Sequence, residues 1–262
     1  MSASKSSAEA AMTSVEVTSK WLPFKTQSGS GLPLFCLPHA GGGASAFRTW
    51  LGQVPGVAVL PVQPPGREAR FREPPHQHME PLVTALADLV LGEAGDRPYA
   101  VYGHSLGALV AFELVREIRR QNAPLPTRLI VSGCSAPGHP FDDGPPVTGM
   151  TRPQLVRMLR DLGGTPEWLL ADESFVDMIL PAVQADFSVK ETYEYRPEPP
   201  LDIPLTVLAS TEDPRASHDA QSRWRQQTTK EFDLHTLVGG HFEVFEQSTI
   251  THKYLAQALH LP

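Results

Sequence analysis

The chain has 262 residues and a formal net charge of −7, with 29 acidic side chains against 22 from lysine and arginine. This charge argues against a general affinity for nucleic acid or an anionic membrane surface. No apolar run approaches the roughly 20 residues that cross a bilayer, and residues 1–19 lack the apolar core of a signal peptide. We therefore expect a soluble cytoplasmic protein, in which Cys36 and Cys134 are small buried hydrophobic residues rather than a disulfide.

Short apolar runs alternate with helical patterns along most of the chain. Residues 1–18 show no such periodicity, so we expect a disordered tail ahead of one domain over residues 19–262. The expected elements, besides a strand leading to Ser105, are strands at 34–37, 57–60, 129–131, 205–209 and 232–237 and helices at 44–51, 79–90, 106–116, 216–228 and 250–259. This alternation predicts an α/β fold, with a mainly parallel sheet and helices on both faces.

The strand rhythm stops between Gly138 and Pro200. Short helical patterns appear there at 154–162, 167–170 and 175–187. An unstructured connection of this length is improbable inside a compact domain, whereas small helices over an active site are a common use of such an insertion. We therefore predict a helical lid at about residues 140–200.

A serine stands where a predicted strand turns into a helix. The sequence Gly-His-Ser-Leu-Gly at residues 103–107 places Ser105 between two glycines, which let strand and helix approach closely. The pentapeptide alone can occur by chance, so its context must decide. That context is a nucleophile elbow, and we predict Ser105 as the nucleophile.

A serine hydroxyl needs a base to take its proton, and the base needs an acid to orient it. Asp213 follows the strand at 205–209, and His241 follows the last strand in a glycine-led loop. They come after the serine in the order acid, then histidine, as this kind of site requires. Asp219 is the alternative acid, because Asp213 precedes a proline and Asp-Pro is a common turn pair. The remaining histidines considered are predicted to be solvated: His76, His78, His218, His252 and His260.

The loop after the first strand has two interpretations. As part of an oxyanion hole, the amide of Ala40 would act together with the amide of Leu106. Alternatively, Gly-Gly-Gly-Ala-Ser-Ala at residues 41–46 fits the dinucleotide pattern G-x-G-x-x-A. The second interpretation is weak, because Gln63 and Pro64 stand after the second strand where an acidic ribose ligand is needed. The Lys-Ser/Thr pair of a P-loop is missing as well.

Taken together, these features resemble the type II thioesterases, the external editing enzymes of polyketide and nonribosomal peptide synthesis, which belong to the α/β-hydrolase superfamily. The likeness extends from about Leu34 to the end of the chain. The motifs that carry it are Leu-Pro-His-Ala-Gly-Gly at 37–42, Gln-Pro-Pro-Gly-Arg-Glu at 63–68, Gly-His-Ser-Leu-Gly at 103–107, Leu-Pro at 180–181 with Ala-Asp-Phe at 185–187, and Gly-Gly-His-Phe at 239–242. Ser210 and Glu243 depart from the family pattern and put the local loop geometry and pocket polarity in question.

The resemblance implies hydrolysis of acyl groups from the phosphopantetheine arm of an acyl or peptidyl carrier protein, without a metal or cofactor, and we expect a monomer. Two other functions stay open: a carboxylesterase or lipase with the same triad, and a scaffold that binds acyl groups or carrier proteins without catalysis.

Two sets of side chains carry open alternatives. Arg67, Arg70 and Arg72 either face an acidic carrier protein or the phosphate of the arm, or form a solvated basic loop balanced by Glu68 and Glu73. In the lid, one set of side chains either binds the acyl chain or forms a packed core, and we take four of them as substrate-binding candidates. The four are Trp168, Phe175, Met178 and Phe187; the others are Leu169, Leu170 and Ile179.

Overall fold

A computed structural model describes residues 20–25, 31–138 and 146–260. The predicted tail at 1–18 lies outside the described residues. The described part contains one six-stranded sheet in the order β2-β1-β3-β4-β5-β6, and every neighbouring pair is parallel. Its strands are β1 (Leu32–Leu37), β2 (Val57–Pro61), β3 (Ala100–His104), β4 (Leu129–Ser132), β5 (Leu205–Ser210) and β6 (Phe232–Leu237).

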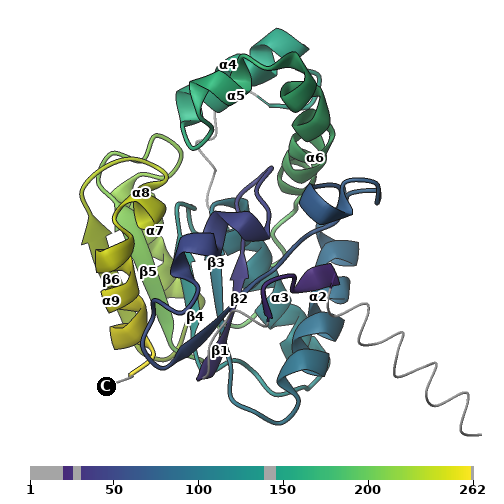
Figure 1. The fold of residues 1–262 in the computed structure, drawn as a ribbon. Helices are drawn as coiled ribbons and strands as arrows, with labels where there is room; N and C mark the ends of the chain where they lie inside the picture. Colours follow the sequence, from purple (N-terminus) through teal and green to yellow (C-terminus); the bar gives the residue numbers. More distant parts are fainter. Residues whose placement is uncertain (1–19, 26–30, 139–145, 261–262) are drawn as a thin grey trace, which may run out of the picture.

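Helices cover both faces of this sheet (Figure 1). The helices α2 (Met79–Ala94) and α3 (Leu106–Arg120) pack on one face, and η2 (Ala44–Trp50) and α9 (Ser248–Ala258) pack on the other. Strand β1 shows why both faces are apolar: Phe35 and Leu37 belong to the first core, and Leu34 and Cys36 to the second. The predicted α/β fold with a parallel sheet is confirmed.

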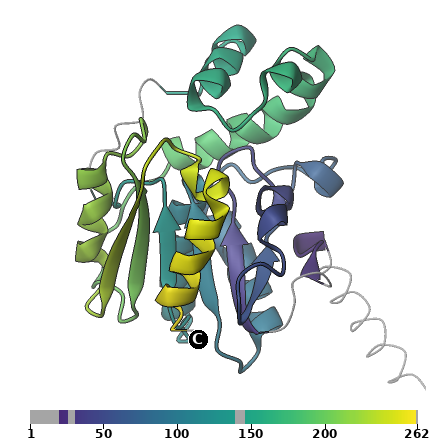
Figure 2. The ribbon, with the colours of Figure 1, turned by 60° about the vertical axis from the view of Figure 1, so that its left-hand side comes forward.

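A helical layer lies beyond the carboxyl ends of the strands (Figures 1 and 2). It consists of α4 (Arg152–Leu162), α5 (Glu167–Leu170) and α6 (Glu173–Glu191). Thr151 and Gln154 form a capping box at the start of α4, and the Asp172 carboxylate accepts amide hydrogen bonds at the start of α6. The layer has a core of its own, formed by Val147, Leu155, Leu159, Leu170, Val176, Leu180, Val183 and Phe187. The helices therefore lie where the lid was predicted.

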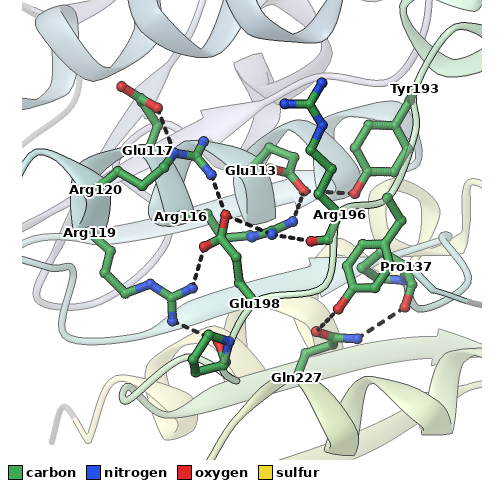
Figure 3. Close-up of polar contacts among 12 residues, drawn as sticks. Glu113, Arg116, Glu117, Arg119, Arg120, Pro137, Tyr193, Arg196, Glu198 and Gln227 are labelled. Carbon is green, nitrogen blue, oxygen red and sulfur yellow. Dashed lines mark hydrogen bonds and ion pairs between the residues drawn. The ribbon is translucent and has the colours of Figure 1, made fainter.

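The segment that leaves this layer is fastened to α3 (Figure 3). The Glu198 carboxylate accepts hydrogen bonds from Arg119 at 2.7 Å and Arg120 at 2.8 Å, and its oxygen is 2.9 Å from the buried guanidinium of Arg116. The Tyr193 hydroxyl donates to Glu113 at 2.7 Å. This network therefore binds the segment that follows α6 to α3, the helix that begins directly after the candidate nucleophile Ser105.

Several local predictions differ from the structure. The segment after the glycine-rich loop is a 3-10 helix, and the helix expected at 216–228 is two short pieces, α7 (His218–Ser222) and η4 (Arg223–Gln227). The break leaves Trp224 fully buried, with its indole N–H donating to the Cys134 carbonyl at 2.8 Å. Two elements were not predicted, because they are too short to show periodicity: η3 (Glu68–Arg70) and α8 (Glu243–Glu246).

The predicted burial is correct for the two cysteines and wrong for His252. Cys36 and Cys134 are buried, and neither forms a disulfide with another described residue. His252 is buried rather than solvated, with its ring edge-on to Trp50 at 5.6 Å. None of the described helices has the length and apolar character needed to span a membrane.

Candidate active site

Ser105 occupies a sharp turn between β3 and α3. Its backbone has φ 56° and ψ −120°, a left-handed conformation that is costly for a residue with a side chain. The flanking glycines make this turn possible. A Cβ on Gly103 would lie 2.1 Å from the Gly107 carbonyl oxygen, and one on Gly107 would lie 2.3 Å from the Leu37 carbonyl oxygen. Strand, turn and helix therefore touch through backbone alone, as a nucleophile elbow requires.

His241 lies between Ser105 and Asp213. Its Nε2 is 3.0 Å from Ser105 Oγ, and its Nδ1 is 2.9 Å from each carboxylate oxygen of Asp213. A carboxylate at Nδ1 favours the tautomer with the proton on that nitrogen, which leaves Nε2 to accept the serine proton. Asp219, the alternative acid, instead pairs with Arg223 on the surface. The structure thus brings the three predicted side chains together, with Asp213 rather than Asp219 in contact with the histidine.

The loops that carry Asp213 and His241 are held by main-chain hydrogen bonds. Strands β5 and β6 are neighbours, and beyond their ends Thr211 donates to the Leu237 carbonyl and Glu212 to the Gly239 carbonyl. The Asp213 carboxylate accepts from the Arg215 amide at 2.8 Å, which fixes its orientation. Both loops therefore end at the same edge of the sheet.

Two residues, Gly133 and Glu243, help to position the His241 side chain and its loop. Gly133 follows β4, and a Cβ there would lie 3.1 Å from His241 Cε1, so a glycine leaves room for the ring. Glu243, which departs from the family pattern, accepts a hydrogen bond from the Gly240 amide at 3.3 Å. In this chain the carboxylate supports the histidine loop.

Two further histidines pack around His241. The His104 ring lies 4.9 Å from the His241 ring, and its Nδ1 is 2.8 Å from Ser132 Oγ. His39 packs edge-on to Phe242. Burial, and secondarily His241 and Arg67, lowers the pKa of His39 to about 3, and burial lowers the pKa of His104 well below its ordinary value. Both rings are therefore neutral at pH 7. The sequence did not predict that His39 and His104 pack near His241, although they lie in the motifs at 37–42 and 103–107.

Ala40 and Leu106 flank the serine. Leu37 pairs in register with Gly103, so the loop after β1 lies beside the elbow. Leu106 is the first residue of α3, so its amide has no partner within the helix. Both residues line the same cavity as Ser105 and His241. The arrangement fits two amides beside a developing oxyanion.

This cavity lies between the sheet edge and the helical layer. It measures about 820 Å³ when the space open to solvent is included. Its wall on the side of the helices is mostly apolar, and Lys190 and Arg215 add positive charge. The apolar side chains from the helical layer that line it are Leu159, Leu162, Phe175, Ile179, Val183 and Phe187, and the layer also contributes Thr165, Asp186 and Lys190.

The four candidate substrate-binding side chains divide into two pairs. Phe175 and Phe187 line the cavity. Trp168 and Met178 do not line it; they are 72% and 54% exposed, so they do not belong to a packed core either. Helical spacing alone did not separate the two faces of these helices.

Two of the three arginines differ from both sequence-based interpretations. Arg67 and Arg70 are buried rather than solvated. Arg67 pairs with Asp186 of α6, and Arg70 pairs with Glu73 while its guanidinium stacks over the Trp21 ring at 4.2 Å. Neither is free to face a carrier protein. Arg72 is exposed beside Phe71.

The dinucleotide interpretation of residues 41–46 is not supported by the loop's contacts. A pyrophosphate needs backbone amides that are free to donate. Here the Gly41 amide donates to Asp186 at 2.7 Å, the Ala44 amide to Gln63 at 3.0 Å and the Ser45 amide to Glu68 at 3.3 Å. Two of these acceptors are carboxylates, which would repel a bound pyrophosphate.

A parallel sheet with serine, acid and histidine after β3, β5 and β6, in that chain order, defines the α/β-hydrolase class. The serine and Ala40 follow adjacent strands at the point where the strand order reverses, where such folds place their sites. Within this class the chain belongs to the thioesterase family, whose thioesterase domain model matches residues 32–258. The predicted thioesterase, and with it a hydrolase, is confirmed.

Individual relatives agree over nearly the whole chain. Gramicidin S biosynthesis protein GrsT from Aneurinibacillus migulanus is 35% identical, over 95% of this chain and 98% of its own. A protein named linear gramicidin dehydrogenase LgrE from Brevibacillus parabrevis is 37% identical over 86% of each chain. The solved structure of the RedJ thioesterase from the prodiginine pathway of Streptomyces coelicolor is 37% identical, with a TM-score of 0.80 over 88% of this chain and 92% of that one.

Proposed function

We propose that this protein hydrolyses acyl groups from the phosphopantetheine arm of acyl or peptidyl carrier proteins in polyketide or nonribosomal peptide synthesis. The observation that carries the proposal is the hydrogen-bonded line from Asp213 through His241 to Ser105, which ends in a cavity with an apolar wall. The names of GrsT and RedJ, which refer to gramicidin S biosynthesis and to the prodiginine biosynthetic pathway, support this setting. The dehydrogenase name of LgrE does not change it, because the glycine-rich loop has its amides occupied.

The reaction follows from the geometry. Ser105 Oγ attacks the thioester carbonyl carbon while His241 Nε2 takes the hydroxyl proton, and the negative oxygen that forms lies against the amides of Ala40 and Leu106. The carbon–sulfur bond then breaks, and His241 gives its proton to the departing thiol. A water molecule attacks the acyl-enzyme, His241 takes one of its protons, and return of that proton to Ser105 Oγ releases the free acid.

The helical layer at residues 146–191 is proposed to act as a lid over the acyl chain. Apolar side chains from this layer line the cavity beside the serine, as an acyl group requires. Buried Cys36 and Cys134 fit the reducing cytoplasm that we propose as the protein's location. The monomeric state stays a prediction, which sedimentation velocity tests.

Two measurements test the proposal. Ser105→Ala should abolish turnover and acyl-enzyme formation without changing the melting temperature by more than a few degrees. Ser222→Ala, at a serine outside the cavity lining, is the matched control and should behave as the wild type. Rates on acyl-carrier proteins, acyl-N-acetylcysteamine thioesters and oxygen esters then separate the open functions. A preference for oxygen esters would favour a carboxylesterase, and acyl-enzyme on the Ser105→Ala variant would refute the nucleophile.

A further inference from the structure

A carboxylate from the helical layer binds the loop that carries the proposed oxyanion donor. Asp186 lies on α6 and is only 6% exposed. Its Oδ2 accepts a hydrogen bond from the Gly41 amide at 2.7 Å. Gly41 directly follows Ala40, so α6 holds the peptide unit next to the one whose N–H faces the reacting carbonyl.

Arg67 fixes this carboxylate and also binds the loop. Its Nη2 donates to Asp186 Oδ1 at 2.8 Å, and its Nη1 donates both to Asp186 Oδ2 and to the Gly42 carbonyl, the latter at 3.2 Å. Two parallel N–H···O bonds of this kind set the plane of the carboxylate as well as its position. The loop is thus held at two successive residues, Gly41 through its amide and Gly42 through its carbonyl.

The loop and α6 also touch directly. Gly41 has φ +77°, and a Cβ there would lie 2.7 Å from Val183 Cγ2, one helical turn from Asp186. Glycine therefore permits both the left-handed turn and the close approach of the helix. A displacement of α6 would remove the acceptor of the Gly41 amide and the packing surface of the loop together.

We propose that Asp186 is a positioning residue for hydrolysis: by binding the Gly41 amide it fixes the direction of the Ala40 N–H, so the oxyanion hole is complete only when α6 rests on the loop. This inference rests on the proposed roles of Ser105 and Ala40. Loss of one oxyanion donor lowers kcat by about 10²- to 10³-fold in a serine hydrolase, and misplacing a catalytic group by about 1 Å can lower kcat by about 100-fold.

Two variants separate positioning from simple stability. Asp186→Asn keeps an oxygen that can accept from Gly41 but leaves the buried Arg67 cation without its counter-charge, so it should be the less stable variant. The double variant Arg67→Met/Asp186→Leu replaces the ion pair with apolar side chains and should be more stable than Asp186→Asn, but it offers Gly41 no acceptor. Asp177→Asn, at an exposed ion pair with Arg152 on the same helix, is the control.

The expected ranking of kcat is therefore the reverse of the ranking of stability for these two variants. On an acyl-N-acetylcysteamine thioester, kcat should fall about fivefold in Asp186→Asn and about 100-fold in the double variant, with KM within about threefold and the control unchanged. The inhibition constant of butylboronic acid, whose adduct with Ser105 mimics the tetrahedral intermediate, should rise in parallel with the loss of kcat. A double variant with wild-type kcat, or a kcat that follows the melting temperature across the series, would overturn the inference. Failure of the proposed function shows separately, as a wild-type protein whose hydrolysis does not depend on Ser105.

Discussion

The imidazole of His241 works beside two rings that carry no charge. His104 lies 4.9 Å away between ring centres, and His39 is in edge contact with Phe242 on the same side of the sheet. Because burial keeps both rings neutral, no second imidazolium stands beside His241 at pH 7 to oppose the proton that we propose it takes from Ser105. The same burial has a consequence for stability in acid.

We predict that His39→Phe makes the fold more resistant to acid. The pKa of this histidine is about 3 in the folded protein and near 6.5 when unfolded, so the unfolded state binds more protons between these values. Its contribution to stability is complete above about pH 6.5 and is lost as the pH falls towards 3. Phenylalanine keeps the ring contacts and removes this loss, so the midpoint of acid unfolding, followed by circular dichroism, should fall by about half a pH unit. His218→Gln, at an exposed histidine, is the control, and an unchanged midpoint in His39→Phe would contradict the prediction.

At this scale the sequence predicts some roles better than others. Asp213 and His241 could be selected because each follows a strand of a parallel sheet, and those strand ends meet at one edge. The buried state of Arg67 could not be predicted, because its partner Asp186 is 119 residues away in a segment expected to be a separate lid. Two oppositely charged residues in distant motifs give no pattern that a periodicity or a local turn would show.

The elbow is an element that tolerates no side chain at its glycines. We predict that Gly107→Ala lowers the free energy of unfolding by about 3 kcal/mol and also lowers kcat, because the added Cβ meets the Leu37 carbonyl at 2.3 Å, where only the backbone can move. Gly92→Ala has the opposite expected sign. That residue is exposed in the last turn of α2 with open space around it, so alanine should stabilise by about 0.5–1 kcal/mol. Urea unfolding measures both changes, and equal effects of the two substitutions would contradict this view of the elbow.

The Glu198 network between α3 and the segment that follows α6 predicts how stability depends on pH and on the Glu198 carboxylate. Burial raises the pKa of Glu198, but hydrogen bonds from Arg119 and Arg116 outweigh this and lower it to about 2. Its contribution to stability is therefore complete above about pH 4.5 and is lost as the pH falls towards 2. Glu198→Gln should cost about 2 kcal/mol at pH 7, since three arginines lose one shared partner.

Glu117→Gln is the matched control for this network. Glu117 pairs with Arg120 within α3 near the surface, so its loss should change stability by less than about 0.5 kcal/mol. Urea unfolding at pH 7 measures both variants. If Glu198→Gln and Glu117→Gln had the same free energy of unfolding, the network would not stabilise the attachment of the segment that follows α6.

The sequence predicts the order and type of the strands and helices well, but it does not predict where a helix is interrupted or continues. Strands in a parallel sheet read as unbroken apolar runs, which is why β1, β4 and β5 were placed within two residues. The helix at 216–228 was wrong as a single element because Trp224 turns into the core and breaks it into two pieces. Helix α6 runs through Pro181, a residue that usually ends a helix.

On the scale of the whole molecule, the cavity lies between two parts with separate apolar cores, the helix-covered sheet and the helical layer. The sheet and its covering helices share large cores on both faces, whereas the helical layer has a core of eight buried side chains. The layer joins the sheet through Asp186 and Val183 on one side and through the Glu198 network on the other. A smaller core with few ties should open at a lower free energy than the sheet.

We therefore predict that the layer exchanges its amide hydrogens before the sheet does. Opening of α4 and α6 separates the small core, the contacts to the loop and the single side chain of Val189 that α6 contributes to the larger core, whereas exchange in β3 needs the sheet itself to unfold. Hydrogen exchange followed by mass spectrometry should give protection at least about 100-fold lower in residues 152–191 than in β3. Covalent labelling of Ser105 with an alkyl fluorophosphonate should slow exchange in α6, because the alkyl chain would contact Phe187 and Val183 on the cavity wall. Equal protection of α6 and β3 in the free protein would mean that layer and sheet unfold as one unit, and an unchanged α6 after labelling would mean that the acyl chain does not lie beneath it.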